Sequence, residues 1–496
     1  MPESNPPSSG DRLSTADVSF LYLEQPTTAM HVGTVMVFRT PDGGLDVERL
    51  MRHIGSRIVY VPRYRQRVKQ VPGRLANPVW VDDDQFDLSY HVRRSALPRP
   101  GDDEQLADLV ARLQSRPLDR RRPLWEVYVV EGLSDGRFAL VSKVHQALVD
   151  GESTVDIGQV VLDSVPDVEP VAELPWAPRR SPNGVQLVLD AVADSVSRPG
   201  EVLDVVRHNV SNLRDVGMGT LRTAGRVAGF ARRLSGVAPA SPLTTGTTPH
   251  RRFAMVDTDL EDYRVIRAAM LEAPAAGLRP HAVTVNDVIL SVLAGALRAW
   301  LLTRAEPVGT GSVVRTLVPM SVRDDVGPPG GDLSRPAAPE VGNRVTSFLI
   351  DLPTGEASPV MRLHQVAYQT RAHRDAGRAV DAAAIAGMAG FAPPTLHSLG
   401  ARVAAGLSRR MFHLVVTNVP GPQHALYADG CELLSTYPVI PLADGQSLSI
   451  GLTSYAGRVF YGLNADREAL PDLDVVGSCI RDALAELRAA VGPVAG

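Results

Sequence analysis

The stretch Val141-Ser-Lys-Val-His-Gln-Ala-Leu-Val-Asp-Gly151 decides how the rest of this chain is interpreted. A short apolar run, Phe138-Ala-Leu-Val141, leads into it, and an Asp-Gly pair that is typical of turns ends it. We therefore predict a buried strand that ends near His145. A histidine at the end of a strand can be directed rigidly into a cleft, and its pKa near neutrality suits proton transfer.

A second strand is expected directly before this one. The segment Pro123–Gly132 is rich in β-branched and aromatic residues, and Leu133-Ser-Asp-Gly136 is a turn sequence. The two strands should form an antiparallel hairpin that delivers His145 and Gln146 to a site. On a strand, neighbouring side chains face opposite sides, so these two would point in opposite directions unless the backbone bends there.

Length and composition describe a soluble globular protein with two large domains. The chain has 496 residues, of which 44% are hydrophobic and 21% charged. A formal net charge of -4 gives no electrostatic case for nucleic acid as a partner. Two cysteines, Cys431 and Cys479, cannot form a disulfide framework, which fits a reducing cytosol.

No segment predicts a membrane anchor. The polar N-terminus lacks the apolar core of a signal peptide. The best candidate span, residues 283–302, contains Asn286, Asp287 and Arg298, and a charge near the centre of a membrane helix costs about 2.5–3.5 kcal/mol. We therefore predict a buried core helix, with Thr284 as its N-cap.

The composition changes along the chain define four regions. Residues 1–12 are expected to be a disordered tail, 13–180 an N-terminal domain with the motif, 181–250 a linker with crossover helices, and 251–496 a C-terminal domain. The crossover helices are rich in arginine. They could contact a membrane surface or simply carry a solvated outer face, and the sequence leaves both interpretations open.

Secondary structure is predicted as alternating strands and helices in both halves. His31, in the apolar run 30–38, is predicted to be a packed strand histidine rather than a site residue. Strands are expected at 86–93, 252–259, 313–320, 345–352 and 415–422, a hairpin at 448–464, and helices at 260–271, 359–374 and 471–491.

With Asp150 and Gly151, His145 resembles the His-His-x-x-x-Asp-Gly motif of CoA-dependent acyltransferases. Further stretches follow in order, among them Leu13-Ser-Thr-Ala-Asp17, Pro123-Leu-Trp-Glu126, Asn286-Asp287, Val318-Pro-Met-Ser-Val-Arg323 and Thr417-Asn-Val-Pro-Gly-Pro422. Together they make the chain similar to the bacterial wax ester synthase/acyl-CoA:diacylglycerol acyltransferase family.

The resemblance implies a fold and a reaction. It implies an α/β (α+β) fold of two domains like chloramphenicol acetyltransferase, each a mixed sheet backed by helices, with an active-site tunnel between them. It also implies transfer of a fatty acyl group from acyl-CoA, as co-substrate and without a further cofactor, to diacylglycerol or a long-chain alcohol. A cytoplasmic protein, peripheral on a membrane or lipid droplet, would suit these lipid partners.

The resemblance also assigns roles to residues. In the family the base is the second histidine of the motif, and that position is Gln146 here. Asp150 would hold the turn through a salt bridge to an arginine, while Asn286, Asp287 and Asn418 would line the tunnel or stabilise the oxyanion. Either asparagine equally suits a helix-start or turn position. A metal site at His145 and Asp150 is rejected, because no third ligand follows from the spacing.

A neutral glutamine cannot accept a proton usefully, so three hypotheses stay open. His145 could act as the base through an altered turn, with Gln146 orienting it. The protein could be a slow transferase that relies on proximity and the oxyanion donor, since loss of a general base costs about 10²–10⁴ in rate. Alternatively, it could be a catalytically impaired relative that binds acyl-CoA or neutral lipid.

Overall fold

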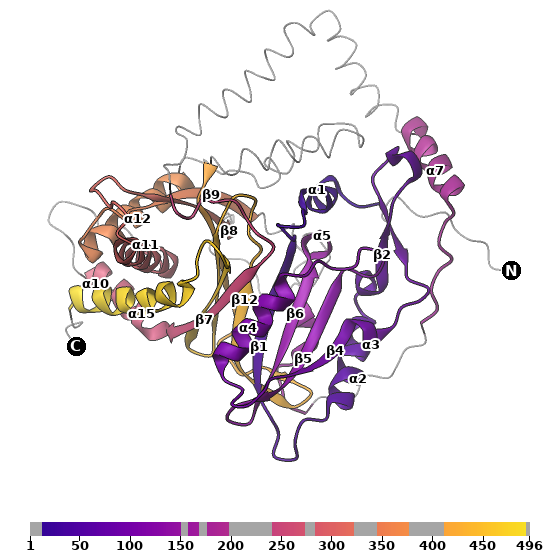
Figure 1. The fold of residues 1–496 in the computed structure, drawn as a ribbon, viewed down its shortest axis with the longest axis horizontal. Helices are drawn as coiled ribbons and strands as arrows, with labels where there is room; N and C mark the ends of the chain where they lie inside the picture. The colour runs from indigo at the N-terminus through magenta and orange to yellow at the C-terminus, as the bar shows by residue number, and fades with distance from the viewer. Residues whose placement is uncertain are drawn as a thin grey trace, which may run out of the picture.

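Two six-stranded sheets, lying side by side, organise the molecule in this computed structural model (Figure 1). The structure describes residues 12–149, 157–167, 176–197, 241–272, 283–321, 345–375 and 411–492. Both sheets contain parallel and antiparallel neighbours, as predicted for mixed sheets. Each sheet has its own hydrophobic core, and helices cover it.

The first sheet has the strand order β11-β12-β1-β6-β5-β4. Its strands are β1 (His31–Arg39), β4 (Val92–Ala96), β5 (Trp125–Leu133), β6 (Arg137–His145), β11 (Tyr427–Ala428) and β12 (Cys431–Val439). A separate pair, β2 (Gln66–Lys69) and β3 (Val79–Asp82), lies beside it. Among the described residues, the α-helices of this half are α1 (Thr15–Leu23), α2 (Val47–Ile58), α3 (Leu88–His91), α4 (Asp103–Gln114), α5 (Gln146–Val149), α6 (Ile157–Val161) and α7 (Gly184–Ser197).

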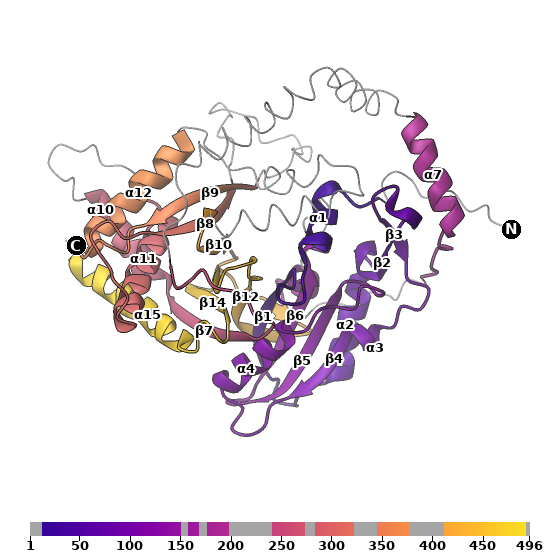
Figure 2. The ribbon, with the colours of Figure 1, turned by 45° about the horizontal axis from the view of Figure 1, so that its top comes forward.

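The second sheet has the order β7-β14-β13-β10-β8-β9. Its strands are β7 (Arg251–Asp259), β8 (Val314–Ser321), β9 (Val345–Leu352), β10 (Leu414–Pro420), β13 (Leu448–Tyr455) and β14 (Arg458–Asp466). Four helices lie together against it (Figure 2): α10 (Leu260–Glu272), α11 (Val285–Thr303), α12 (Pro359–Asp375) and α15 (Leu473–Ala490). The strands and helices predicted for this half are confirmed within a few residues.

The hairpin that leads to the motif is confirmed. Strands β5 and β6 pair antiparallel, and the turn places Asp135 and Gly136 at positive φ, which these two residue types tolerate well. Strand β6 is buried along almost its whole length and ends at His145. The motif is therefore carried by a central, fully packed strand.

The prediction of a strand at 86–93 is wrong for most of that segment. The Asp87 carboxylate accepts a hydrogen bond from the Ser89 N–H at 2.9 Å and caps the helical turn α3, so the extended backbone of β4 begins only at Val92. A side-chain cap on the backbone competes with strand formation, and here the cap prevails.

Strand β12 joins the two halves. It comes from the C-terminal part of the chain but pairs antiparallel with β1 in the first sheet. It also lies on β13 and β14, where Gly451 and Gly462 face each other across the pair. A Cβ on Gly462 would lie 1.8 Å from the Pro438 carbonyl oxygen, so the two glycines form a notch that admits β12. The sheets therefore do not follow the division of the sequence at residue 250.

Helix α11 lies within the second core. Among the described helices it is the one long and apolar enough to cross a membrane, and 72% of that apolar window is buried inside the protein. It packs against α12 and α15, with Leu290, Leu293 and Trp300 fully buried. The prediction of a buried core helix, capped by Thr284, is confirmed.

Several predictions concern residues outside the described ranges. These are the tail at 1–11, the turn with Asp150 and Gly151, and most of the arginine-rich segment between 198 and 240. The domain boundaries and the open question about the crossover helices stay predictions.

Candidate active site

The motif lies where β6 passes into the short helix α5. His145 is the last residue of β6 and pairs with His31 of β1, while Gln146 is already the first residue of α5. The alternation of side chains along a strand therefore stops at His145 and does not set the direction of Gln146. The backbone N–H of Gln146 donates to the Met30 carbonyl at 2.9 Å, which ties the helix start to the end of β1.

His145 acts as the N-cap of α5. Its Nδ1 accepts a hydrogen bond from the Ala147 N–H at 3.0 Å, which satisfies one of the free donors at the helix start. Since Nδ1 accepts, the proton of the neutral ring belongs on Nε2. Nε2 lies 3.8 Å from Oε2 of Glu24, and the ring is fully buried. Both nitrogens therefore face protein atoms.

The electrostatics keep this imidazole neutral. Burial lowers the pKa of His145 to about 4, and the nearby Glu24 carboxylate only partly opposes that effect. Glu24 itself forms an ion pair with Arg120, which also donates to the Leu21 carbonyl at 2.8 Å. A buried, neutral ring with an occupied lone pair is a poor general base, so these contacts weigh against His145 in that role.

Two further titratable groups, His31 and Lys143, lie near His145, and both contact carbonyl oxygens at the C-terminal end of α4. Nε2 of His31 lies 3.1 Å from the Gln114 carbonyl oxygen, and the buried Lys143 amine donates to the carbonyls of Leu113 and Arg116. Burial lowers the pKa of His31 well below its usual value and that of Lys143 to about 8. They satisfy the free carbonyls of a helix C-terminus, and the prediction that His31 is a packed strand histidine is confirmed.

Gln146 differs from these buried groups because its side chain is partly exposed. The described part of the chain offers it no side-chain hydrogen-bond partner. A carboxamide both donates and accepts hydrogen bonds but stays neutral across the physiological pH range. It can orient a hydroxyl group, and it cannot remove its proton.

Asn286 and Asn418 meet in the second half, although 132 positions separate them. The Asn418 Nδ2 donates to the Asn286 Oδ1 at 3.1 Å, which joins the first turn of α11 to β10. Both side chains are partly exposed. The pairing brings two of the predicted site residues together and fixes the direction of their amides.

Asp287 has a structural role. Its Oδ2 accepts the Thr284 N–H at 2.8 Å in a reciprocal capping box, and its Oδ1 accepts the Thr370 hydroxyl at 2.7 Å. The side chain is buried, with 1% of its surface exposed. Both carboxylate oxygens are thus used to hold α11 and α12 in place.

Two of the predicted motif residues, Asp150 and Gly151, lie outside the described residues. The ion pair expected for Asp150 stays a prediction. Across the described ranges, no group of three His, Cys, Asp or Glu side chains is arranged to hold a metal ion.

Comparison with protein families shows which family the chain belongs to. Residues 13–288, more than half of its length, match the wax ester synthase/diacylglycerol acyltransferase catalytic domain, and residues 341–488 match the WS/DGAT C-terminal domain. The chain belongs to the wax ester synthase/diacylglycerol acyltransferase family. It is therefore an acyltransferase.

Two relatives from Mycobacterium tuberculosis strain H37Rv illustrate the relationship. The probable diacylglycerol O-acyltransferase tgs2 is 32% identical over 494 residues, covering 97% of this chain and all of the relative. The probable diacylglycerol O-acyltransferase tgs3 is 45% identical over 258 residues, which is 52% of this chain and 95% of the relative.

Solved structures give the same fold. The wax ester synthase/diacylglycerol acyltransferase from Marinobacter aquaeolei VT8 is 27% identical with a TM-score of 0.65, covering 97% of this chain and all of that one. The starter condensation domain of rhizomide synthetase, at 12% identity and a TM-score of 0.51, covers 97% of this chain and 94% of that one, and shares only the fold. The predicted two-domain architecture is thus confirmed, while the tunnel stays a prediction.

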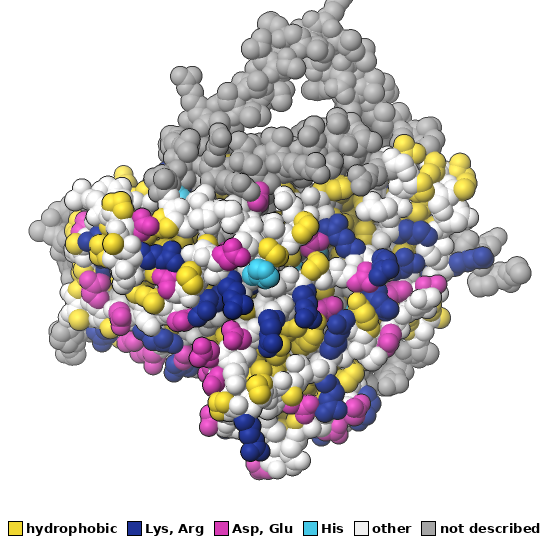
Figure 3. All heavy atoms as spheres, viewed as in Figure 1, with side chains coloured by type: hydrophobic (Ala, Val, Ile, Leu, Met, Phe, Trp, Pro, Cys, Tyr) yellow, Lys and Arg dark blue, Asp and Glu magenta, His cyan; other side chains and the backbone are white. Residues whose placement is uncertain are grey.

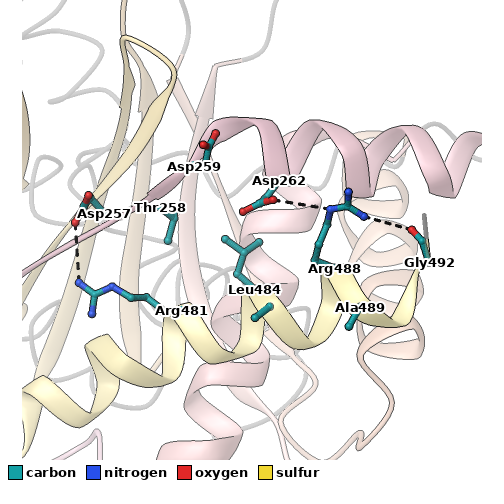
Figure 4. Close-up of a pocket in the computed structure, with 10 residues that line it drawn as sticks. Asp257, Thr258, Asp259, Asp262, Arg481, Leu484, Arg488, Ala489 and Gly492 are labelled. Atoms are coloured by element: carbon teal, nitrogen blue, oxygen red, sulfur yellow. Dashed lines mark hydrogen bonds and ion pairs between the residues drawn. The ribbon is translucent and has the colours of Figure 1, made fainter. Parts of the chain in front are cut away.

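A surface groove of about 610 Å³ lies elsewhere on this family member, between β7, α10 and α15. Figure 4 shows its charged groups paired across it, with Arg488 3.8 Å from Asp262 and Arg481 4.0 Å from Asp257. None of the predicted site residues lines it. The groove is separate from the acyltransferase motif.

Sequence reasoning missed the pair of Glu24 and Arg120 beside His145. The two residues are 96 positions apart, and each stands in a stretch that reads as ordinary polar surface. Only the fold shows that α1 ends against the motif strand. No local pattern could have indicated this contact.

Proposed function

We propose that this chain transfers a fatty acyl group from acyl-CoA to the hydroxyl group of diacylglycerol, giving triacylglycerol, or of a long-chain alcohol, giving a wax ester. Membership in the family supports this reaction, as do the names of the relatives, which include diacylglycerol O-acyltransferases and a wax ester synthase. Acyl-CoA serves as co-substrate, and the proposal requires no further cofactor.

In the proposed step the acceptor oxygen attacks the thioester carbonyl carbon. The C–O bond forms, the tetrahedral oxyanion collapses, and the C–S bond to CoA breaks. The hydroxyl proton must end on the CoA sulfur, either directly or through a base. Donors near the carbonyl oxygen stabilise the oxyanion, and the Asn418 Nδ2, which the Asn286 Oδ1 holds at 3.1 Å, suits this role.

The contrast between His145 and Gln146 carries the mechanistic part of the proposal. The imidazole is buried, neutral and already used as a helix cap, whereas the partly exposed side chain at the motif is an amide. We infer that Gln146 orients the acceptor hydroxyl and that no side chain of the motif removes its proton. The proton then passes to the departing thiolate, and the rate lies about 10²–10⁴ below that of a relative with a base.

We also propose that the protein works in the cytoplasm at the surface of a membrane or lipid droplet. Its proposed acceptors are lipids that collect at such surfaces, and both cysteines, Cys431 and Cys479, are free and buried. Flotation of the purified protein with diacylglycerol-containing vesicles would support this placement, and a protein that stays at the bottom of the gradient would refute it.

The reaction is tested by measuring free CoA released from palmitoyl-CoA, with diacylglycerol or hexadecanol as acceptor, together with chromatography of the lipid product. We expect slow, acceptor-dependent release and formation of the corresponding ester. A wild-type protein that is silent with every acceptor, but that becomes active as Gln146→His, would instead be an inactivated family member that binds its ligands.

A further inference from the structure

The loop Arg116-Pro-Leu-Asp-Arg-Arg-Arg122, between α4 and β5, concentrates positive charge beside the motif. It contains four arginines and one aspartate, a formal charge of +3. Arg116, Arg120 and Arg121 are exposed, and Arg122 is partly exposed. Figure 3 shows Lys and Arg side chains gathered in the middle of one face, in the region of α4, β5 and β6. We call residues 116–122 the arginine loop.

The backbone of the arginine loop is held from several sides. The buried Lys143 amine donates to the Arg116 carbonyl, and Leu118 is buried with 6% of its surface exposed. Arg120 forms its ion pair with Glu24, and the Arg122 N–H closes a turn on the Asp119 carbonyl at 3.1 Å. Because these contacts fix the backbone of the loop, an anion that binds there has to order only the exposed side chains.

Three of the four guanidinium groups remain available to a ligand. Arg116 has no side-chain hydrogen bond or ion pair with the described residues. Arg121 is 89% exposed, and its Nε and Nη2 donate to the two carboxylate oxygens of Asp119 at 3.1 and 3.2 Å, so its Nη1 group is the one without a hydrogen bond to the described residues. The Arg122 Cζ lies 3.9 Å from the centroid of the Tyr90 ring, a cation–π contact that leaves its N–H groups free to donate.

The arginine loop is also close to the motif. Arg120 contacts Glu24, and Glu24 lies 3.8 Å from the ring of His145, whose neighbour in the chain is Gln146. In an acyl-CoA, the pantetheine arm separates the thioester from the nucleotide phosphates. A phosphate site is therefore needed near the reacting groups but outside them, which is where the arginine loop lies.

We propose that Arg116, Arg121 and Arg122 bind the nucleotide phosphates of the acyl-CoA donor. This inference rests on the proposed function, since it takes acyl-CoA as the donor. Arginine suits the ligand because its planar guanidinium donates two parallel hydrogen bonds to phosphate oxygens. The headgroup of an anionic lipid carries similar chemistry, but the link through Arg120 and Glu24 to the motif favours the donor.

Direct binding of free CoA tests the site without requiring turnover. Isothermal titration of the full chain with CoA should give an affinity about tenfold weaker for the double variant Arg116→Gln/Arg121→Gln than for wild type. Binding to wild type should also weaken as NaCl is raised, and more steeply than binding to the variant. The control Arg264→Gln, at an arginine 51% exposed on α10, should bind like wild type. Equal affinities for wild type and the double variant would overturn the proposal.

Turnover with two donors gives a second readout. We expect the double variant to raise the KM for palmitoyl-CoA about tenfold, whereas S-palmitoyl-pantetheine, which lacks the nucleotide, should be used equally by variant and wild type. A similar loss with both donors would show that the substitutions merely disturb the fold and would refute the assignment. A variant that keeps its CoA affinity but no longer binds phosphatidylglycerol vesicles would assign the loop to lipid headgroups and also refute it.

The two proposals fail in different ways. If CoA binds through the arginine loop but no acyl group is transferred, the phosphate site is supported and the proposed reaction is refuted. If transfer occurs but the substitutions leave CoA affinity and KM unchanged, the proposed reaction is supported and the phosphate site is refuted.

Discussion

Two buried histidines of the first half, His31 and His145, differ in their surroundings from three partly exposed amides, Gln146 of the motif and the pair Asn286 and Asn418 of the second half. His31 and His145 pair across β1 and β6, are fully buried, and direct a nitrogen to a helix end. Gln146 and the pair of Asn286 and Asn418 are partly exposed, and two of them are fixed against each other. The groups that could move a proton are thus enclosed, while the accessible groups are neutral.

This difference shows that residue type alone does not assign a catalytic role. In the proposed mechanism, the histidine of the acyltransferase motif stabilises the start of a helix, and its burial and its hydrogen bond weaken it as a base. The accessible amides can orient a hydroxyl and stabilise an oxyanion. If this distinction is correct, substitutions of the buried histidines should mainly change stability, whereas substitutions of the accessible amides should mainly change activity.

The largest effect is expected for Gln146→His. A histidine at the start of α5 would supply the missing base, so the rate of acyl transfer at pH 7.5 should rise by about 10²–10⁴. The rate is measured as CoA release with diacylglycerol, and Gln146→Ala serves as the control, with a rate at or below wild type. A Gln146→His variant no faster than wild type would show that the motif position does not limit the reaction.

Asn418→Ala should lower kcat by about 10²-fold, the usual loss when one oxyanion donor is removed. Since Asn286 holds the Asn418 amide, Asn286→Ala should give a similar loss, and the double variant little more than either single one. The two residues act as a unit only if the losses are not additive. Additive losses, or a change confined to KM, would contradict an oxyanion role.

His145→Phe should destabilise the protein by about 1–3 kcal/mol, because the Ala147 N–H then stays buried without an acceptor. His145→Asn is the matched variant, since an asparagine oxygen can cap the same N–H. We expect Asn to restore both the melting temperature and most of the activity. Loss of all activity in both variants, with stability retained in Asn, would instead identify His145 as the base.

The pH dependence of stability has a defined sign. The pKa of His145 is about 4 when folded and near 6.5 when unfolded, so the unfolded state binds more protons between these values. The free energy of unfolding should therefore fall as the pH drops from 6.5 to 4, and fall less in His145→Asn. Urea titrations at several pH values measure this, and identical slopes for both proteins would contradict the assigned pKa.

A single added methyl group at the junction between the two halves should lower the stability of the protein. Gly462→Ala places a Cβ against Pro438 of β12, so we expect a loss of about 1–3 kcal/mol in unfolding free energy. Gly43→Ala, at a position with no atom within 4 Å of the added Cβ, is the control and should be nearly neutral. Equal stability of the two variants would show that β12 is not held in the glycine notch.

The sequence predicted the elements whose signals are local. The apolar run and turn residues place β5 and β6, and Thr284 with Asp287 marks the start of α11. Strand β12 was missed because polar residues interrupt its alternation and its partner β1 lies about 400 positions away. The contact between the two asparagines and the burial of His145 depend on the same long-range packing, which no local pattern encodes.

The most direct test of the account is the pH dependence of kcat/KM for wild type and for Gln146→His between pH 5 and 7.5. We predict a nearly flat profile for wild type, because the His145 imidazole has a pKa of about 4 and Gln146 does not titrate. The profile of Gln146→His should rise with pH through a pKa near 6.5, as the new imidazole becomes neutral. A wild-type profile that itself rises through a pKa between 6 and 7 would show that a histidine already acts as the base.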